Sequence, residues 1–368
     1  MSGIIGDNTG DHSGQIATVQ GITTSSSDPA IDTDPSGGIG TVWANTTSGE
    51  MYACTDATAG ANVWTNVGAG SGDIKKTFEG TAYGFACGGL NASAKRIDIE
   101  RISFTSDGNS TDFGDLSVAR FNIAGATDIN TSYGYLQGGA PASGYSNIID
   151  RFAMASGGTA SDVGDTTHAR RTGGGSSSST HGYMNGGESA SPTYTDIIDK
   201  FAFGASSNSS DVGNLTGSGG EVGGGTSELY GYAFGGYRSS ANVNIIEKYS
   251  FSTDGNATDV GDLTVGRSGQ GGANSNSTHI YASGGYSGSN SDVVDKWAIA
   301  TDGNATDVGN LTVARYHVVG IPSQTYGYCV GGRPYSDVIE KYSLSSDGNA
   351  ADVGNLTEIK GYMGGCQY

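Results

Sequence analysis

Long apolar runs, basic charge and cysteine are all scarce in this sequence of 368 residues. No run of roughly 18 or more apolar residues occurs, so we expect no transmembrane helix and no membrane insertion. The N-terminus, MSGIIGDNTGDHSG, has neither the charged start nor the apolar stretch of a secretory signal, so export by that route is not expected. Asp and Glu outnumber Lys and Arg by 37 to 18, and no basic stripe is present, which argues against nucleic acid as a partner.

Cysteine and histidine are too sparse to indicate a metal or catalytic site. The four cysteines are scattered and no CxxC pair occurs, so neither a disulfide framework nor a zinc site is expected, and we predict free thiols. The five histidines include His168, His181, His279 and His317, which fall at unrelated places, and no GxSxG motif accompanies the abundant serines. No unrepeated acid–base pair is visible either. We therefore predict a non-enzymatic protein without a cofactor.

Glycine, by contrast, is abundant, with 64 residues, and the sequence repeats six times at intervals of 45 to 50 residues. Each unit reads approximately YGYxxGG, a variable stretch, IIDKFSF and DGNATDVGNLTVAR. Repeats of this length indicate a stacked or ring-shaped architecture, because one unit cannot bury its own apolar faces. Regularly placed Ile, Val, Phe and Tyr between turn residues predict short strands, so we expect an ordered all-β protein.

Each unit contains four strand-like segments, which are clearest in the fifth unit, at residues 268–273, 279–284, 292–300 and 305–312. Gly, Ser, Asn and Asp separate them, and the TDG that follows the third segment is a tight-hairpin signal. The pattern predicts a four-stranded antiparallel meander. The third segment carries adjacent apolar residues, as at Ile197 and Ile198, which indicates a sheet buried on both faces.

The two ends of the repeat region complement each other. Residues 358–368 (EIKGYMGGCQY) align with the first strand of other units, whereas the first unit starts at its second strand, residues 83–89. We predict that the C-terminal segment supplies the missing strand and closes the ring without an exposed edge. In the register that we expect, Cys87 lies opposite Gly361 and Cys366 lies near Ala82, which leaves the two thiols too far apart for a disulfide.

Three features of the unit carry a family resemblance. A double glycine ends the second strand, an IDKF-like third strand follows, and a leucine and an arginine close the unit, as in Leu263 and Arg267. In these features residues 77–368 resemble the kelch repeats of six- and seven-bladed β-propellers. The resemblance implies a six-bladed kelch-like β-propeller over residues 76–368. A DVG or DFG triplet stands where the kelch tryptophan would open the fourth strand, and in the third unit Gly217 lies near the arginine position.

Residues that recur in every unit are expected to serve the shared fold. Each third strand carries an acidic residue followed by a base; the acidic residues are Glu100, Asp150, Asp199, Glu247, Asp295 and Glu340. A catalytic carboxylate would differ between units, so we interpret the repeated ones as hydrogen-bond partners between blades. The DGNATD loops resemble an oxygen-rich calcium loop. Because DG is also a hairpin signal and two units lack it, we favour a turn, and calcium binding remains the alternative.

In an up-and-down meander, the loops between the second and third strands emerge at the same end as the connections between units. These loops vary in length and content, while the loops at the opposite end repeat DGNATD. Variable loops on a fixed scaffold are typical recognition sites. We predict that they bind the partner, a host cell-surface glycan or protein; neutral drift of exposed loops is the alternative. The candidate residues are Tyr145, Tyr194, Tyr237, Arg238, Tyr286, Arg333 and Tyr335.

The residues before the repeats follow a different pattern. Residues 40–75 contain two apolar segments around TTSGE and a third apolar segment after them, which predict a small β module held by Trp43, Tyr52 and Trp64. Residues 1–39 are rich in Gly, Ser, Thr and Asp and predict an extended arm that orders on binding.

The segment WANTTSGEMYACTDATAGANVWTNVG, the opening MSGIIG and the DGNATDVGNLTVAR repeats are together similar to structural, fibre-like proteins of marine tailed bacteriophages. The resemblance implies a tail-fibre-like virion protein, assembled in the host cytoplasm, whose N-terminal arm contacts other virion proteins and whose propeller faces the host. The N-terminal region would also hold any homo-oligomer together. Two alternatives remain, a capsid decoration protein that makes only virion contacts and a glycan-degrading propeller enzyme.

Overall fold

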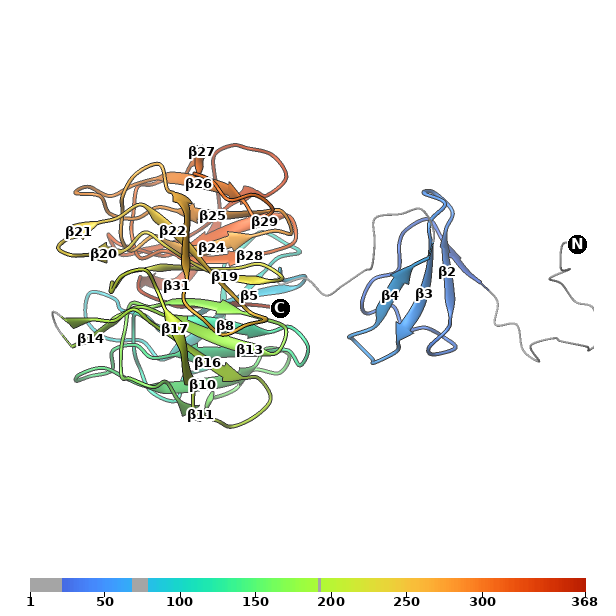
Figure 1. Cartoon of the computed structure of the whole chain (residues 1–368), viewed down its shortest axis with the longest axis horizontal. Coiled ribbons are helices and arrows are strands. Elements are labelled where there is room, and N and C mark those ends of the chain that lie inside the picture. The colour runs from blue at the N-terminus through green and yellow to red at the C-terminus, as the bar shows by residue number, and fades with distance from the viewer. Residues whose placement is uncertain (1–21, 68–78, 191–192) are drawn as a thin grey trace, which may run out of the picture. The chain divides into compact units, whose positions relative to one another are not determined.

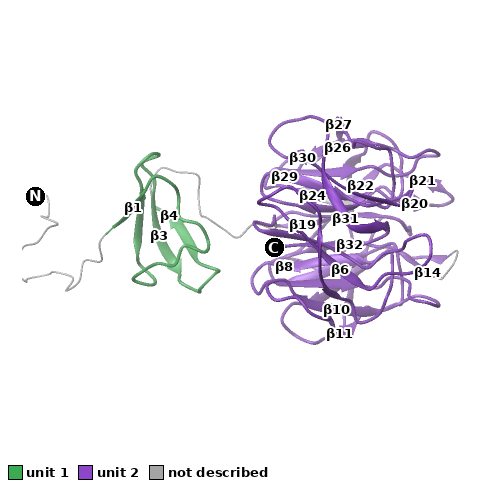
Figure 2. Ribbon diagram, turned by 180° about the vertical axis from the view of Figure 1, so that it is seen from behind, with its two compact units in different colours: residues 1–76 green, residues 77–368 purple. Residues whose placement is uncertain are grey.

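Regular structure in the described part of this protein is β-sheet. The computed structural model describes residues 22–67, 79–190 and 193–368, and within these ranges every regular element is a strand. Those ranges accordingly hold no helix of the length and apolarity that a membrane span requires. The chain separates into two compact units, residues 1–76 (unit 1) and residues 77–368 (unit 2), each of which is described by itself (Figure 2). The predicted all-β class is confirmed.

Unit 1 contains a four-stranded sheet with the order β1–β2–β3–β4. Its strands are β1 (Thr23–Ser25), β2 (Val42–Asn45), β3 (Met51–Asp56) and β4 (Val63–Asn66). Tyr52 and Trp64 are fully buried. The rings of Trp43 and Trp64 meet edge to face, with their centroids 5.9 Å apart. These aromatic residues therefore form the small core that the sequence predicted.

Residues 22–39 differ from the extended arm that was predicted over residues 1–39. Strand β1 pairs in parallel with β2, and the Trp43 indole donates a 2.9 Å hydrogen bond to the Ser27 carbonyl. The backbone and side-chain amides of Asn62 also donate to the Ile31 carbonyl, at 2.9 and 3.0 Å. This polar segment is ordered because the module supplies partners to its backbone groups, which composition alone does not reveal. Residues 1–21 lie outside the described residues, and there the arm stays a prediction.

Unit 2 contains six four-stranded antiparallel sheets, numbered I to VI here (Figure 1). Sheet I consists of β32 (Gly364–Gln367), β5 (Tyr83–Cys87), β6 (Asp98–Ser103) and β7 (Thr111–Asp115). Sheet II consists of β8 (Ala124–Asp128), β9 (Tyr133–Gln137), β10 (Ile148–Ala153) and β11 (Ser161–Asp165). Sheet III consists of β12 (Gly174–Ser177), β13 (His181–Asn185), β16 (Ile197–Ala202) and β17 (Ser210–Asn214).

The remaining three sheets follow the same plan. Sheet IV consists of β18 (Gly223–Thr226), β19 (Tyr230–Phe234), β22 (Ile245–Ser250) and β23 (Thr258–Asp262). Sheet V consists of β24 (Gly271–Ser275), β25 (His279–Ser283), β26 (Val293–Ala298) and β27 (Thr306–Asn310). Sheet VI consists of β28 (Val319–Pro322), β29 (Tyr326–Val330), β30 (Ser336–Ser343) and β31 (Ala351–Lys360). Two ribbons lie in the loops after the second strands of sheets III and IV, namely β14 (Glu188–Ala190) with β15 (Thr193–Tyr194) and β20 (Tyr237–Arg238) with β21 (Ala241–Asn242).

The third and fourth strands of every sheet explain the repeated IIDKF and DVG segments. Successive strand residues face opposite sides of a sheet, and both Ile198 and Asp199 are 0% exposed, so both faces are covered as predicted. Ile198 pairs with Gly213 and Asp199 with Asp211, which leaves Val212 as the extra residue of a β-bulge. The same irregularity occurs in all six sheets. The DVG triplet is therefore a bulge, which increases the local twist of the sheet.

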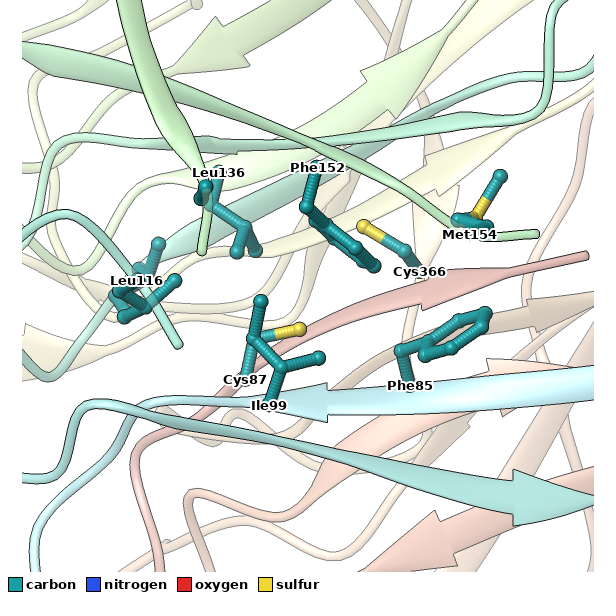
Figure 3. Close-up of a cluster of buried hydrophobic side chains, with 10 residues drawn as sticks. Phe85, Cys87, Ile99, Leu116, Leu136, Phe152, Met154 and Cys366 are labelled. Carbon is teal, nitrogen blue, oxygen red and sulfur yellow. The ribbon is translucent and has the colours of Figure 1, made fainter. Parts of the chain in front are cut away.

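The C-terminal strand completes the first sheet, as the sequence predicted. Strand β32 pairs antiparallel with β5, where Gly364 lies opposite Cys87 and Cys366 opposite Phe85. The predicted register was wrong by three residues, because the chain first turns at Tyr362, with φ 62°, before the strand begins. Cys87 and Cys366 are both buried and free, and Cys366 packs in a core that includes Phe152 of sheet II (Figure 3).

The first strands of the six sheets contact one another in a closed cycle, β32–β8–β12–β18–β24–β28–β32. Their glycines make this approach possible. A Cβ atom on Gly175 would lie inside van der Waals contact of the Gly125 carbonyl oxygen, and one on Gly125 would meet the Gly365 oxygen in the same way. The high glycine content of the chain therefore has a packing cause at these strands.

Replacing Gly175 with alanine is expected to destabilise unit 2 by about 1–3 kcal/mol, since neighbouring backbones must separate to admit the methyl group. Gly255 is the matched control, because its Cβ position is open. Gly255→Ala should leave stability within about 1 kcal/mol of the parent. Urea unfolding followed by circular dichroism measures both variants. Equal midpoints for the two would show that the sheets are not packed this closely.

Candidate functional site

Most of the repeated charged residues join one sheet to the next. Each third-strand carboxylate accepts a backbone N–H from the chain that leaves the preceding sheet, such as Ser117 N–H to Asp150 at 3.0 Å. Each also meets a basic side chain, in the pairs Arg120–Asp150, Arg170–Asp199, Arg238–Glu247, Arg267–Asp295, Arg315–Glu340 and Lys360–Glu100. Buried carboxylates require such partners. The interpretation of these residues as structural is confirmed.

Arg238, which was predicted to contact a partner, belongs to this structural set instead. Its side chain is 6% exposed and donates to Glu247, whose side chain is 0% exposed. Gly219, not Gly217, occupies the arginine position of its unit, four residues after Leu215. A Cβ on Gly219 would lie 2.6 Å from Cγ of Arg238, so the Arg238 side chain fills the space of the missing arginine. The prediction of a partner contact was wrong because Arg238, although it lies in a variable loop, takes the place of the basic residue that the other units carry at the repeated position.

The DGNATD loops are also used for contacts between sheets. Their aspartates pair with third-strand lysines, in Lys200–Asp254, Lys248–Asp302, Lys296–Asp347 and Lys341–Asp107. Where the next loop lacks this aspartate, the base is an arginine that lies over a tyrosine ring instead, as Arg151 does over Tyr133 at 5.0 Å. The loop asparagines accept backbone N–H groups of the preceding sheet, as Asn256 does from Asn214 at 3.0 Å. Within the described ranges, no group of three or more His, Cys, Asp or Glu side chains is placed to hold a metal ion.

The first strands surround a central cavity of about 140 Å³. One end of it is lined by six residues at equivalent positions, where the chain enters each first strand. We call them the mouth residues; they are Asn122, Thr172, Glu221, Gly269, His317 and Tyr362. All six have a positive φ, between 48° and 62°.

The backbone of the mouth repeats although its side chains do not. Backbone N–H groups donate to the mouth residue of the preceding sheet all around the cycle, for example Thr172 to Asn122 at 3.2 Å and Tyr362 to His317 at 3.2 Å. Sheet IV makes this bond one residue later, from Val222 to Thr172 at 3.3 Å. Six equivalent backbone positions thus present Asn, Thr, Glu, Gly, His and Tyr around one opening.

Five of the six mouth residues carry a side chain although their positive φ makes a side chain sterically unfavourable. A non-glycine residue held at a positive φ costs about 1–3 kcal/mol, and a β-branched or bulky residue is unusual there. Gly269 shows that glycine is compatible with this backbone. Thr172, His317 and Tyr362 nevertheless occupy the equivalent positions. Strained residues of this kind gather at functional sites, so the mouth is the candidate functional site.

Glu221 and His317 form an unrepeated acid–base pair at the mouth, contrary to the sequence-based interpretation that none exists. His317 Nε2 lies 3.6 Å from Glu221 Oε1, and the Ser268 hydroxyl donates to Glu221 at 2.8 Å. Burial alone would raise the pKa of Glu221, but the adjacent His317, the hydrogen bond from Ser268 and the nearby charge of Arg171 outweigh that effect and lower it. Glu221 is therefore a carboxylate at neutral pH, and 36% of its side chain is exposed.

Aromatic rings continue from His317 in both directions. The His317 ring stacks on Tyr362 at 4.0 Å between centroids, and Tyr362 meets Phe121 edge to face at 5.6 Å. On the other side, Tyr316 lies 4.9 Å from His317 and 5.5 Å from Tyr286. The signal for the mouth residues was present in the sequence as one variable column, two residues after the repeated arginine. The column could not be recognised as a site from the sequence, because an alignment of the units does not show that these six residues meet at one cavity.

The other predicted loop residues lie beside the mouth. Tyr286 is 40% exposed and reaches it through Tyr316, and Arg333 lies 3.3 Å from the Tyr362 hydroxyl and stacks over Tyr335. Tyr145 donates to Glu188 at 3.0 Å and lies under the guanidinium of Arg171, next to Thr172. The remaining pair, Tyr194 and Tyr237, meet edge to face at 6.2 Å, and both adjoin Gly220, the neighbour of Glu221: Gly220 pairs with Tyr237, and a Cβ on it would lie 2.8 Å from the Tyr194 ring. We call the mouth residues together with these six loop residues, without Arg238, the mouth face.

Comparisons with protein families and with curated protein sequences add no relative to this picture. No protein-family model matches the chain, and no curated protein sequence matches it. The mouth face therefore carries the functional inference.

Proposed function

We propose that unit 2 is a six-bladed, kelch-like β-propeller and that its mouth face binds a glycan or a protein on the surface of a host cell. The closed cycle of first strands and the completion of sheet I by β32 support the propeller. One observation carries the binding role. The backbone around the mouth repeats from sheet to sheet, whereas the side chains of the mouth face differ between sheets. Tyrosine, histidine and arginine there supply aromatic area and hydrogen bonds, as binding surfaces commonly do.

We further propose that the protein is a non-enzymatic, tail-fibre-like component of a bacteriophage particle, attached to the other virion proteins through its N-terminal region. Similarity of the N-terminal segment and of the repeats to fibre-like phage proteins supports this role. The Glu221–His317 pair is of the kind that an enzyme would need, but Glu221 is the only carboxylate among the described residues that line the cavity, which supports binding rather than glycan cleavage. Most glycoside hydrolases use a pair of carboxylates.

Adsorption of the purified protein to host cells tests the binding role. Replacing Tyr237, Tyr286 and Tyr335 together with alanine is expected to weaken adsorption at least about tenfold, the effect of losing a single strong contact residue. Tyr326 is the matched control, because it is 37% exposed but starts β29, at the end of sheet VI away from the mouth. Tyr326→Ala should adsorb like the parent protein. Equal adsorption of the triple variant and the parent would refute binding by this face.

Two further measurements address the alternatives. Gold-labelled antibody against the protein on intact particles should mark tail fibres; a label spread over the capsid would favour the decoration role. Host polysaccharide incubated with the protein should keep its size in gel filtration. Shorter products would favour the enzyme.

A further inference from the structure

We infer that the mouth is a binding subsite for one uncharged pyranose ring, such as the terminal residue of a glycan; this rests on the proposed function and names its ligand. Five side chains are kept at mouth positions where glycine would relieve the backbone, so their atoms are needed there. The sixth position is glycine for a reason of space. A Cβ on Gly269 would lie 2.9 Å from Cε1 of His317, so a side chain there would displace the imidazole.

The size of the cavity limits the ligand. Its volume of about 140 Å³ is below the roughly 300–1,000 Å³ of sites that hold drug-sized molecules. The first strands around the cavity are rich in glycine, and the backbones of neighbouring strands are in close contact. A single ring at the end of a chain fits these limits, while the rest of the glycan would extend over the tyrosines of the mouth face.

The polar side chains that line the cavity suit a ligand with hydroxyl groups better than a ligand with a negative charge. Asn122 and Thr172 each bring a group that both donates and accepts, Glu221 accepts, and His317 supplies ring nitrogens. Sugar hydroxyls donate and accept in the same way. The rings of His317 and Tyr362, which stack on each other, add aromatic surface against which the C–H groups of a pyranose can pack. An anionic sugar would meet the Glu221 carboxylate and a chain whose net charge is −19.

Titration of the full chain with single sugars tests the inference. The neutral probes are glucose, galactose, mannose and N-acetylglucosamine, and the anionic probes are galacturonic acid and N-acetylneuraminic acid. Saturation-transfer NMR and calorimetry should detect at least one neutral sugar binding at one site, and neither anionic sugar binding as tightly. If none of the neutral sugars binds, or if an anionic sugar binds best, the inference is wrong.

The strained backbone allows variants that separate binding from folding. Thr172→Gly and His317→Gly remove mouth side chains but relieve a positive φ, so their melting temperatures should not fall, while sugar affinity should drop at least about tenfold. Glu221→Gln keeps the shape and should also weaken binding. Tyr326→Ala is the control and should bind like the parent. Unchanged affinity in all three mouth variants would place the sugar elsewhere and overturn the inference.

Cell adsorption distinguishes this inference from the proposed function. If no sugar binds the mouth but adsorption still depends on Tyr237, Tyr286 and Tyr335, the pyranose subsite is wrong and the binding face stands. If sugars bind and adsorption is unaffected by any mouth-face variant, the subsite stands and the attachment role is wrong.

Discussion

Replacing Arg238 with alanine will destabilise unit 2 by about 3–5 kcal/mol, the usual cost of removing one partner from a buried ion pair. The effect is large because the Glu247 side chain is 0% exposed and would keep the Thr216 N–H while losing its charged partner. Urea unfolding at neutral pH measures it as a lower midpoint at unchanged slope. A partner-binding arginine in an exposed loop would instead change stability by less than about 0.5 kcal/mol.

The arginine should be transferable to its repeated position. In the double variant Gly219→Arg with Arg238→Ala, the new side chain starts four residues after Leu215, as Arg267 does after Leu263. The volume vacated by Arg238 is available to it, and Gly219 does not require a glycine backbone, since its φ is not positive. We expect the double variant to recover most of the lost stability. Tyr237→Ala, which alters the same ribbon without touching the ion pair, is the control. A stable single variant, or a double variant no better than the single one, would contradict this account of Arg238.

Deletion of residues 361–368 will abolish the cooperative unfolding of unit 2. The deletion removes β32, exposes the β5 edge, and uncovers the core around Phe85 and Cys87. It also breaks the cycle of first strands between β28 and β8. We expect a loss comparable with the total stability of a domain, about 5–15 kcal/mol. Thermal unfolding by circular dichroism and gel filtration would show a broad transition and aggregated protein.

Moving the same residues provides the matched control. The Tyr368 carbonyl accepts the Thr81 N–H at 3.0 Å, so the end of β32 lies beside the chain that enters β5. Residues 361–368 inserted immediately before Thr81 in the shortened chain would form a hairpin in the order that sheets II to VI use. We expect cooperative unfolding to return. A shortened chain that melts like the parent would show that closure by β32 contributes little.

The repeat allowed a large part of the architecture to be predicted. Strand positions in the fifth unit agree with β24 to β27 to within two residues at each end, apart from the start of β24, which begins three residues later than expected because Ser268 and Gly269 belong to the turn at the mouth. The missing first strand of the first unit correctly indicated that β32 pairs with β5. The register of that pair was wrong, since a turn residue such as Tyr362 is not distinguishable from a strand residue in one sequence.

The candidate site was predicted less well than the scaffold. Comparison between units correctly separated repeated, structural carboxylates from variable loops, and six of the seven proposed residues lie beside the mouth. Arg238 was misassigned because its role depends on Gly219 in another unit, and Glu221 and His317 were missed because they also come from different units.

Local sequence was sufficient for the elements that depend on neighbours along the chain, namely strands, hairpins, bulges and the residues that each unit buries, because their spacing recurs in every copy. The three-dimensional arrangement was needed to find the mouth, where one residue from each of six units meets the others at a central cavity. These contacts depend on how the sheets close on one another, and no periodicity within a unit specifies which variable positions then come together.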